Sequence, residues 1–189
     1  VELPVRLELR KLRDLLRPRG MELVDTPATG GGTTAAAGGG DLRPGAAVAV
    51  QLVRGDLNVA VIGTVTHVDG ARLLAFGHAL LPAGAVDMPL AAVRVFGVVP
   101  NQVSSFKVGA VTVPLGAWHQ DRLSALAGRL GAAAAMLPLR VAVVAPGDSA
   151  GYSFEIVRHP LFTTGLAQAV VLGSVESAAR LLGDATLEL

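Results

Sequence analysis

Residues 63–78 read GTVTHVDGARLLAFGH, the segment from which the fold of the chain is best predicted. Two apolar runs flank Asp69-Gly70, a dipeptide typical of two-residue β-hairpin turns with positive φ. The segment therefore predicts a hairpin in which Asp69 and Gly70 occupy the two turn positions. Its second strand leads to His78, and histidine is the side chain best suited to proton transfer near neutral pH.

The predicted register places His67 opposite Arg72. Because side chains alternate along a strand, four residues then share one face of the second strand, and we expect its apolar part to face the core: Arg72, Leu74, Phe76 and His78. In this arrangement His78 lies partly buried at one end of a barrel, where a general base could act. The alternative is a structural histidine whose two ring nitrogens are both hydrogen bonded.

The composition predicts a compact, β-rich domain. Apolar residues make up 51% of the 189 residues, aromatic residues 4% and charged residues 16%, with a formal net charge of +1. With few aromatic side chains for base stacking, we expect no nucleic-acid partner. The absence of cysteine excludes thiol nucleophiles, disulfides and cysteine-ligated metal sites. No run of eighteen apolar residues occurs, so we expect no transmembrane segment.

Three parts are predicted along the chain: a small N-terminal helix and strand segment (1–25), a linker rich in Gly, Thr and Ala (26–40), and a β domain (41–189). The basic residues between Arg6 and Arg19 are interpreted as the solvated face of a short helix. The β domain ends in a predicted helix at 166–182. Its predicted strands are 47–53, 58–68, 72–76, 93–99, 104–113, 115–119, 126–130, 139–144 and 152–158. Short strands at this spacing indicate a closed or nearly closed all-β barrel.

The sequence offers no metal or cofactor site. In the predicted hairpin, His67 and His78 lie roughly 20 Å apart, too far to share a zinc ion. His119 and His159 have no histidine neighbour at ligand spacing. The glycine-rich stretch 30–40 lacks the Gly-Lys-Ser/Thr ending of a phosphate-binding loop, so we interpret it as linker. We therefore expect neither a metal nor a cofactor.

Two carboxylates are candidates to orient His78 through its Nδ1 atom. Asp87 follows nine residues after the histidine, and Asp121 lies further along the chain. A carboxylate bonded to Nδ1 would fix the tautomer and stabilise an imidazolium. For Asp87 the structural alternative is a side-chain-to-backbone bond that closes a loop. For Asp121 it is an ion pair with the adjacent Arg122.

The segment FGH at 76–78, preceded by GTVT at 63–66, resembles the histidine segment of the SpoIVB-type serine peptidases, and most closely that of bacterial envelope proteins with a SpoIVB-like domain. The resemblance runs from about residue 41 to 189 and implies a chymotrypsin-like double β-barrel, whole or in part. Further segments that carry it are LRPG (42–45), AVQLVRGDL (49–57), VDMP (86–89), SSFK (104–107), QDR (120–122), YSFEIVRHP (152–160) and LGDAT (182–186).

The resemblance implies that His78 is the catalytic base and that a serine nucleophile lies in a Gly-x-Ser-Gly-x-Pro sequence. That sequence is absent here. Where it would fall, residues 165–177 read GLAQAVVLGSVES, so Ser174 is the nearest counterpart. Ser174 lies within the predicted helix and lacks the following glycine that would help to form an oxyanion hole. Ser105, or a serine beyond Leu189, is the other candidate nucleophile.

From these residues we expect a SpoIVB-peptidase-like domain without hydrolytic activity, acting as a scaffold or binding module of a larger secreted or envelope protein. The expected partner is a polypeptide, and an extracytoplasmic location follows from the resemblance alone. The alternative is an active serine endopeptidase in which His78 is the base. A third hypothesis is a module that binds peptides as an added strand at an exposed barrel edge.

Overall fold

The computed structural model describes residues 13, 14, 17, 42–100, 105–145 and 148–179. The predicted N-terminal segment, apart from residues 13, 14 and 17, and the whole predicted linker lie outside these residues. The elements are β1 (Ala47–Gly55), β2 (Val59–Asp69), β3 (Arg72–Ala75), β4 (Gly84–Val99), β5 (Phe106–Arg122), β6 (Ala125–Leu130), β7 (Met136–Ala145), β8 (Asp148–Val157) and α2 (Thr163–Ala179). All strand pairs are antiparallel, and the predicted mainly β fold with a C-terminal helix is confirmed.

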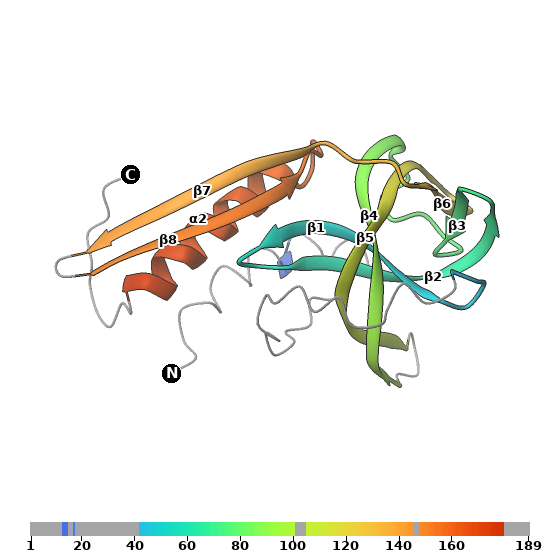
Figure 1. Cartoon of the computed structure of the whole chain (residues 1–189), viewed down its shortest axis with the longest axis horizontal. Helices are drawn as coiled ribbons and strands as arrows, with labels where there is room; N and C mark the ends of the chain where they lie inside the picture. The colour runs from blue at the N-terminus through green and yellow to red at the C-terminus, as the bar shows by residue number, and fades with distance from the viewer. Residues whose placement is uncertain (1–12, 15–16, 18–41, 101–104, 146–147, 180–189) are drawn as a thin grey trace.

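Six strands form a barrel-like ring. The pairings run from β1 through β2, β3, β6, β5 and β4, and β4 pairs with β1 again. The β1–β4 ladder has only three residue pairs, so the ring is incomplete. Within the described ranges there is one such ring and no second one. The remaining strands, β7 and β8, form a long hairpin that extends away from the ring, with α2 along it (Figure 1).

The hairpin joins the ring through β8, which pairs with the end of β1. The helix contacts both β7 and β8. Three of its buried side chains recur at a spacing of four residues, which places them on one helix face: Leu166, Val170 and Ser174. Phe162, just before the helix, and Val175 within it are also buried. The hairpin and α2 therefore form a second layer that shares β1 with the ring.

The core lies inside the ring and continues under the hairpin. Every residue from Val48 to Val53 in β1 is buried, on both strand faces, because neighbouring elements cover both sides of this strand. Trp118 of β5 is fully buried, and its indole N–H donates to the carbonyl of Ala49 at 3.1 Å. That bond satisfies the one polar atom of the largest core side chain.

The turn between β2 and β3 differs from the predicted one. Asp69 pairs with Arg72, so Gly70 and Ala71 occupy the turn. Of these residues only Gly70 has a positive φ, 52°, as a type II′ turn requires at its first central position. The prediction of Asp69 and Gly70 as turn residues was wrong, because Asp69 keeps a strand conformation.

The faces of β3 are also the reverse of those predicted. Leu73 and Ala75 are buried, whereas Arg72, Leu74 and His78 are exposed. Both faces of this short strand carry apolar side chains, so alternation alone could not identify the inner one. Packing against the rest of the ring selects Leu73.

β4 and β5 differ most from the predicted strands. β4 begins at Gly84 rather than at Val93, and β5 runs unbroken where two strands were expected on either side of Pro114. The β4–β5 ladder shifts register near Pro114, and these irregularities accommodate a residue that has no N–H to donate. Within the part of the chain that the structure describes, residues 93–99 and 106–111 pair only with each other, as a two-stranded arm beyond the ring (Figure 1). We call these residues the β4–β5 arm.

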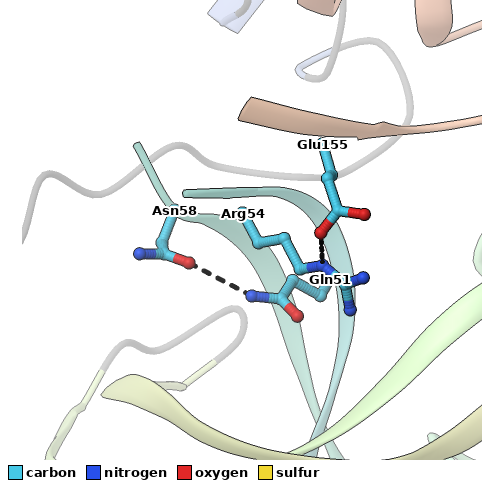
Figure 2. Close-up of polar contacts among 4 residues, drawn as sticks. All are labelled: Gln51, Arg54, Asn58 and Glu155. Carbon is cyan, nitrogen blue, oxygen red and sulfur yellow. Dashed lines mark hydrogen bonds and ion pairs between the residues drawn. The ribbon is translucent and has the colours of Figure 1, made fainter. Parts of the chain in front are cut away.

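Two side-chain contacts lie near the end of β1, and the one from Arg54 joins the ring to the hairpin. Arg54 of β1 donates from Nε to Oε2 of Glu155 in β8 at 2.5 Å, and Gln51 donates to Asn58 across the β1–β2 turn at 3.1 Å (Figure 2). The hydrogen bond from Arg54 is the main cause that lowers the pKa of Glu155. Charge therefore reinforces the backbone ladder where β8 begins to pair with β1.

The end of β1 fits tightly against β8. Asp56 donates its N–H to the carbonyl of Ser153 at 3.1 Å, and its carboxylate accepts the Ser153 N–H at 2.7 Å. Gly55 has a φ of 117°, and a Cβ added there would lie 2.2 Å from the Ser153 carbonyl oxygen. The junction therefore requires glycine for both its conformation and its lack of a side chain.

We predict that Gly55→Ala lowers the free energy of unfolding by roughly 2–4 kcal/mol, because it adds a steric overlap to an unfavourable φ. Gly45→Ala is the matched control, since Gly45 has a φ of 93° but open space around it. Gly151→Ala, with open space and no positive φ, should have little effect. Urea denaturation measures all three variants. Equal losses for Gly55→Ala and Gly45→Ala would contradict the close contact with Ser153.

Candidate functional site

The loop that carries His78 begins with two residues in unusual conformations. After β3 ends, Phe76 and Gly77 have φ values of 75° and 72°, which turn the chain out of the sheet. A positive φ is uncommon for phenylalanine and must be held by its surroundings. The Phe76 N–H donates to the Thr64 carbonyl at 2.9 Å, and its ring packs edge-on against Trp118 at 5.9 Å.

Gly63 makes room for the Phe76 ring. A Cβ at position 63 would lie 2.5 Å from that ring, so only glycine lets the aromatic side chain lie over β2. Gly63 and Phe76 thus act together. They anchor the start of the loop in the core and direct His78 outward.

His78 is exposed, so the prediction of partial burial was wrong. Its Nδ1 atom lies 2.7 Å from the carbonyl oxygen of Ala79, and the edge of its ring faces Phe76 at 6.0 Å between centroids. A carbonyl oxygen can only accept, so Nδ1 carries the proton and donates it. The Nε2 atom is then the proton acceptor of the imidazole. The Nδ1 atom is therefore bonded to a backbone carbonyl instead of the expected carboxylate.

Asp121 holds the same loop by its backbone. The carboxylate is buried, and it accepts the N–H groups of Leu80 at 2.8 Å, of Leu81 at 2.7 Å and of Ala83 at 3.4 Å. A buried carboxylate is stabilised by such donors. In the structure Asp121 therefore fixes the chain that follows His78, and it makes no hydrogen bond to the imidazole itself.

The other candidate partners also have different contacts. Asp87 is exposed and accepts the Ala135 N–H at 2.9 Å, which is the loop-closing contact of the structural alternative. Arg122 donates to the side chain of Gln120 at 2.8 Å, rather than to Asp121. Asp87 thus ties the β6–β7 connection to β4, and it does not contact His78.

The two candidate serines lie in different settings. Ser174 is in α2, with only 4% of its surface exposed, and its hydroxyl donates to the Val170 carbonyl one turn earlier at 2.7 Å. Such a bond is ordinary for serine within a helix. Ser105 is exposed, just before β5. The contacts of Ser174 do not bring it to His78.

A buried histidine that the sequence did not indicate lies beside this loop. His159 follows β8, accepts the Leu161 N–H at Nδ1 at 3.3 Å, and packs on Phe162 at 5.1 Å. Burial lowers the pKa of His159, and the nearby Asp121 carboxylate partly offsets that effect. Asp121 therefore links the loop after His78 electrostatically to the connection between β8 and α2. No spacing in the sequence places residues 121 and 159 together.

A pocket of about 380 Å³ is lined by Pro82, Gly84, Asp121, Arg122, Leu123 and Ser124. His78 is not among these residues. In the part of the chain that the structure describes, no three His, Cys, Asp or Glu side chains are grouped so as to hold a metal ion. Over the same residues, no helix has the length and apolar character needed to cross a bilayer.

No protein-family model, curated protein or solved structure matches the chain. The features of the site that bear on function are the exposed imidazole of His78 on a loop held by Asp121, and the hydroxyl of Ser174 held inside a helix.

We predict that His159 makes the fold less stable in mild acid. Its pKa is lower in the folded chain than the value of 6.5 for the free side chain. Below pH 6.5 the unfolded chain binds a proton at this histidine more readily than the folded chain does. The free energy of unfolding therefore keeps its full value above pH 6.5 and falls as the pH drops toward the pKa of His159 in the folded chain. Urea denaturation between about pH 7.5 and 5 should show a smaller loss for His159→Gln than for the parent chain.

His119→Phe is the matched control, because His119 is exposed. It should keep the pH dependence of the parent chain. If His159→Gln and the parent lost stability in parallel as the pH fell, His159 would not be the titrating group.

Proposed function

We propose that residues 41–189 form a SpoIVB-peptidase-like domain without hydrolytic activity, which binds a polypeptide partner as a module of a larger secreted or envelope protein. The family and the location rest on the sequence resemblance. The lack of hydrolysis and the mode of binding are argued from the contacts of the described residues.

The proposal rests on the burial and the hydrogen bond of the Ser174 hydroxyl. Its hydroxyl is buried and donates to the Val170 carbonyl, so its proton is already used within α2. An attacking serine needs its hydroxyl within hydrogen-bond reach of the base, with backbone N–H groups free to stabilise an oxyanion. The N–H of a residue in mid-helix is used by the helix itself. A base without such a nucleophile supplies little hydrolysis.

The alternative, a serine endopeptidase, is favoured by one feature of His78. Its Nδ1–H donates to the Ala79 carbonyl, which leaves an exposed Nε2 able to accept a proton. This is the tautomer that a general base requires. The nucleophile would then be Ser105 or a serine beyond Leu189, and Asp121 would act by holding the loop rather than by contacting the imidazole.

The edge of β7 supports binding of a polypeptide as an added strand. β7 has ten residues and pairs only with β8, so no described strand covers its other edge. An edge strand offers N–H and C=O groups that an extended segment can pair with. The sequence hypothesis placed such an edge on the barrel, whereas in the structure it belongs to the hairpin.

The β7–β8 register determines which backbone N–H and C=O groups of β7 point away from β8. Ser153 of β8 directs both its N–H and its C=O toward Asp56, at the end of β1. Its partner in β7, Arg140, therefore directs its own polar backbone groups away from β8, as do the residues two and four positions further on. Pro138, two residues before Arg140, also directs its backbone away from β8, so its lack of an N–H costs no bond to that strand. Among the described residues, no strand pairs with the outward N–H groups of Arg140, Ala142 and Val144.

We predict that the full chain is not labelled by a fluorophosphonate probe, because the hydroxyl of Ser174 is buried in α2 and bonded to the Val170 carbonyl instead of to His78. The measurement is gel fluorescence beside an active serine protease, with His78→Ala as the comparison variant. Labelling that disappears in His78→Ala would establish the endopeptidase alternative. Labelling that persists in this variant would also contradict the proposal, because it would reveal an activated serine that does not depend on His78.

We predict that Ala142→Pro weakens binding of peptides selected on the full chain from a random display library by at least about tenfold. Proline removes an outward N–H from the free edge but no bond to β8, so the free energy of unfolding should change by less than about 1 kcal/mol. Fluorescence anisotropy of the selected peptides measures the affinity.

Ala142→Val is the matched control, because it enlarges the same side chain and keeps the N–H. Its peptide affinity should equal that of the parent chain. Selected peptides that bind Ala142→Pro as tightly as the parent would show that the β7 edge is not the binding site.

A further inference from the structure

The two faces of the β7–β8 hairpin differ in polarity. On one face, Leu139 and Val141 of β7 are partly buried and pack against the core cluster that includes side chains of α2. On the other face, Arg140, Ala142 and Val144 are all exposed. Because side chains alternate along a strand, a strand added at the free edge of β7 would place one row of side chains on each of these faces.

The face that packs on α2 favours apolar side chains in the added strand. Leu139 and Val141 are only partly buried, so part of their apolar surface is still open to solvent. Residues of the added strand that lie opposite these two would cover that surface. β-Branched and aromatic side chains suit such positions, because they pack well against neighbours on a half-buried sheet.

The exposed face carries a cation without an acidic partner. Arg140 is the only charged residue of β7. Glu155 of β8 lies on the same face, because it pairs with Pro138, two residues from Arg140. Its carboxylate is bonded to Arg54 of β1, and this is the ion pair found among the described residues. The guanidinium of Arg140 is therefore left exposed at the edge, where an added strand would pass.

We propose that the segment which adds to the β7 edge carries Asp or Glu opposite Arg140, with an apolar residue on each side of that acid. This inference rests on the proposed function, strand addition at β7. The backbone N–H and C=O of Arg140 point away from β8, so they can pair with the acidic residue itself. Opposite residues of an antiparallel pair have Cβ atoms about 4.5–5.5 Å apart, within reach of a carboxylate and a guanidinium. The two apolar neighbours would then lie opposite Leu139 and Val141.

The test uses peptides selected on the full chain from a random display library, restricted to those whose binding Ala142→Pro weakens. We expect their sequences to share an Asp or Glu between two apolar residues. One such peptide is synthesised in three forms, with the acid, with its amide and with lysine at that position. Fluorescence anisotropy then measures the affinity of each form for the parent chain, Arg140→Gln and Arg140→Glu.

The acidic peptide should bind Arg140→Gln about threefold more weakly than it binds the parent chain, because one exposed cross-strand pair is lost. The amide peptide should bind both chains equally. Arg140→Glu should reverse the preference, so that the lysine peptide binds more tightly than the acidic one. These differences should shrink as the salt concentration rises.

Arg94→Gln is the matched control, because Arg94 is also an exposed arginine on a strand but lies in the β4–β5 arm. It removes the same charge from the chain and should leave all three affinities unchanged. An equal loss for Arg94→Gln and Arg140→Gln would indicate a general attraction between charges and would overturn the pairing with Arg140.

The outcomes separate this inference from the proposed function. Peptides that depend on the β7 edge but lack the acidic residue, or that bind Arg140→Gln as tightly as the parent chain, would overturn the inference and leave strand addition intact. If Ala142→Pro weakened none of the selected peptides, strand addition at β7 and the inference that rests on it would both be wrong.

Discussion

The structure depends on β1, because this strand belongs both to the ring and to the layer formed by the hairpin and α2. β1 pairs with β2 and β4 along its buried half and with β8 at its end, so the ring and the hairpin share a backbone. The transfer from one to the other occurs at Gly55, where the chain passes so close to Ser153 that no side chain fits. The ion pair of Arg54 with Glu155 lies at the same place. Because this contact is made by backbone atoms, there is little freedom to adjust the angle between the two layers.

The loop after β3 is held with comparable strictness at both ends. Phe76 anchors it in the core, where Gly63 makes room for the ring, and Asp121 receives three backbone N–H groups at its other end. A loop so constrained presents His78 in a defined tautomer. The same carboxylate that would orient a histidine in a catalytic arrangement is here used to satisfy backbone donors. The imidazole is bonded to the Ala79 carbonyl and not to a carboxylate.

The surface proposed to bind a polypeptide lies on the β7–β8 hairpin, outside the ring. The β7 edge offers unpaired backbone groups and suits a partner recognised through main-chain hydrogen bonds.

The sequence by itself determined that the domain is mainly β, that a helix ends it, that β2 and β3 form a hairpin, and that Ser174 lies within the helix. Each of these follows from local periodicity or from turn residues, which depend on neighbours in the chain. The tertiary structure alone decided the turn position at Gly70, the inward face of β3, the continuity of β5 through Pro114, and the roles of Asp121 and His159. These depend on contacts between residues far apart in sequence. Packing against the ring selects Leu73 over Leu74, and the amides near Leu80 lie about forty residues from the carboxylate that binds them.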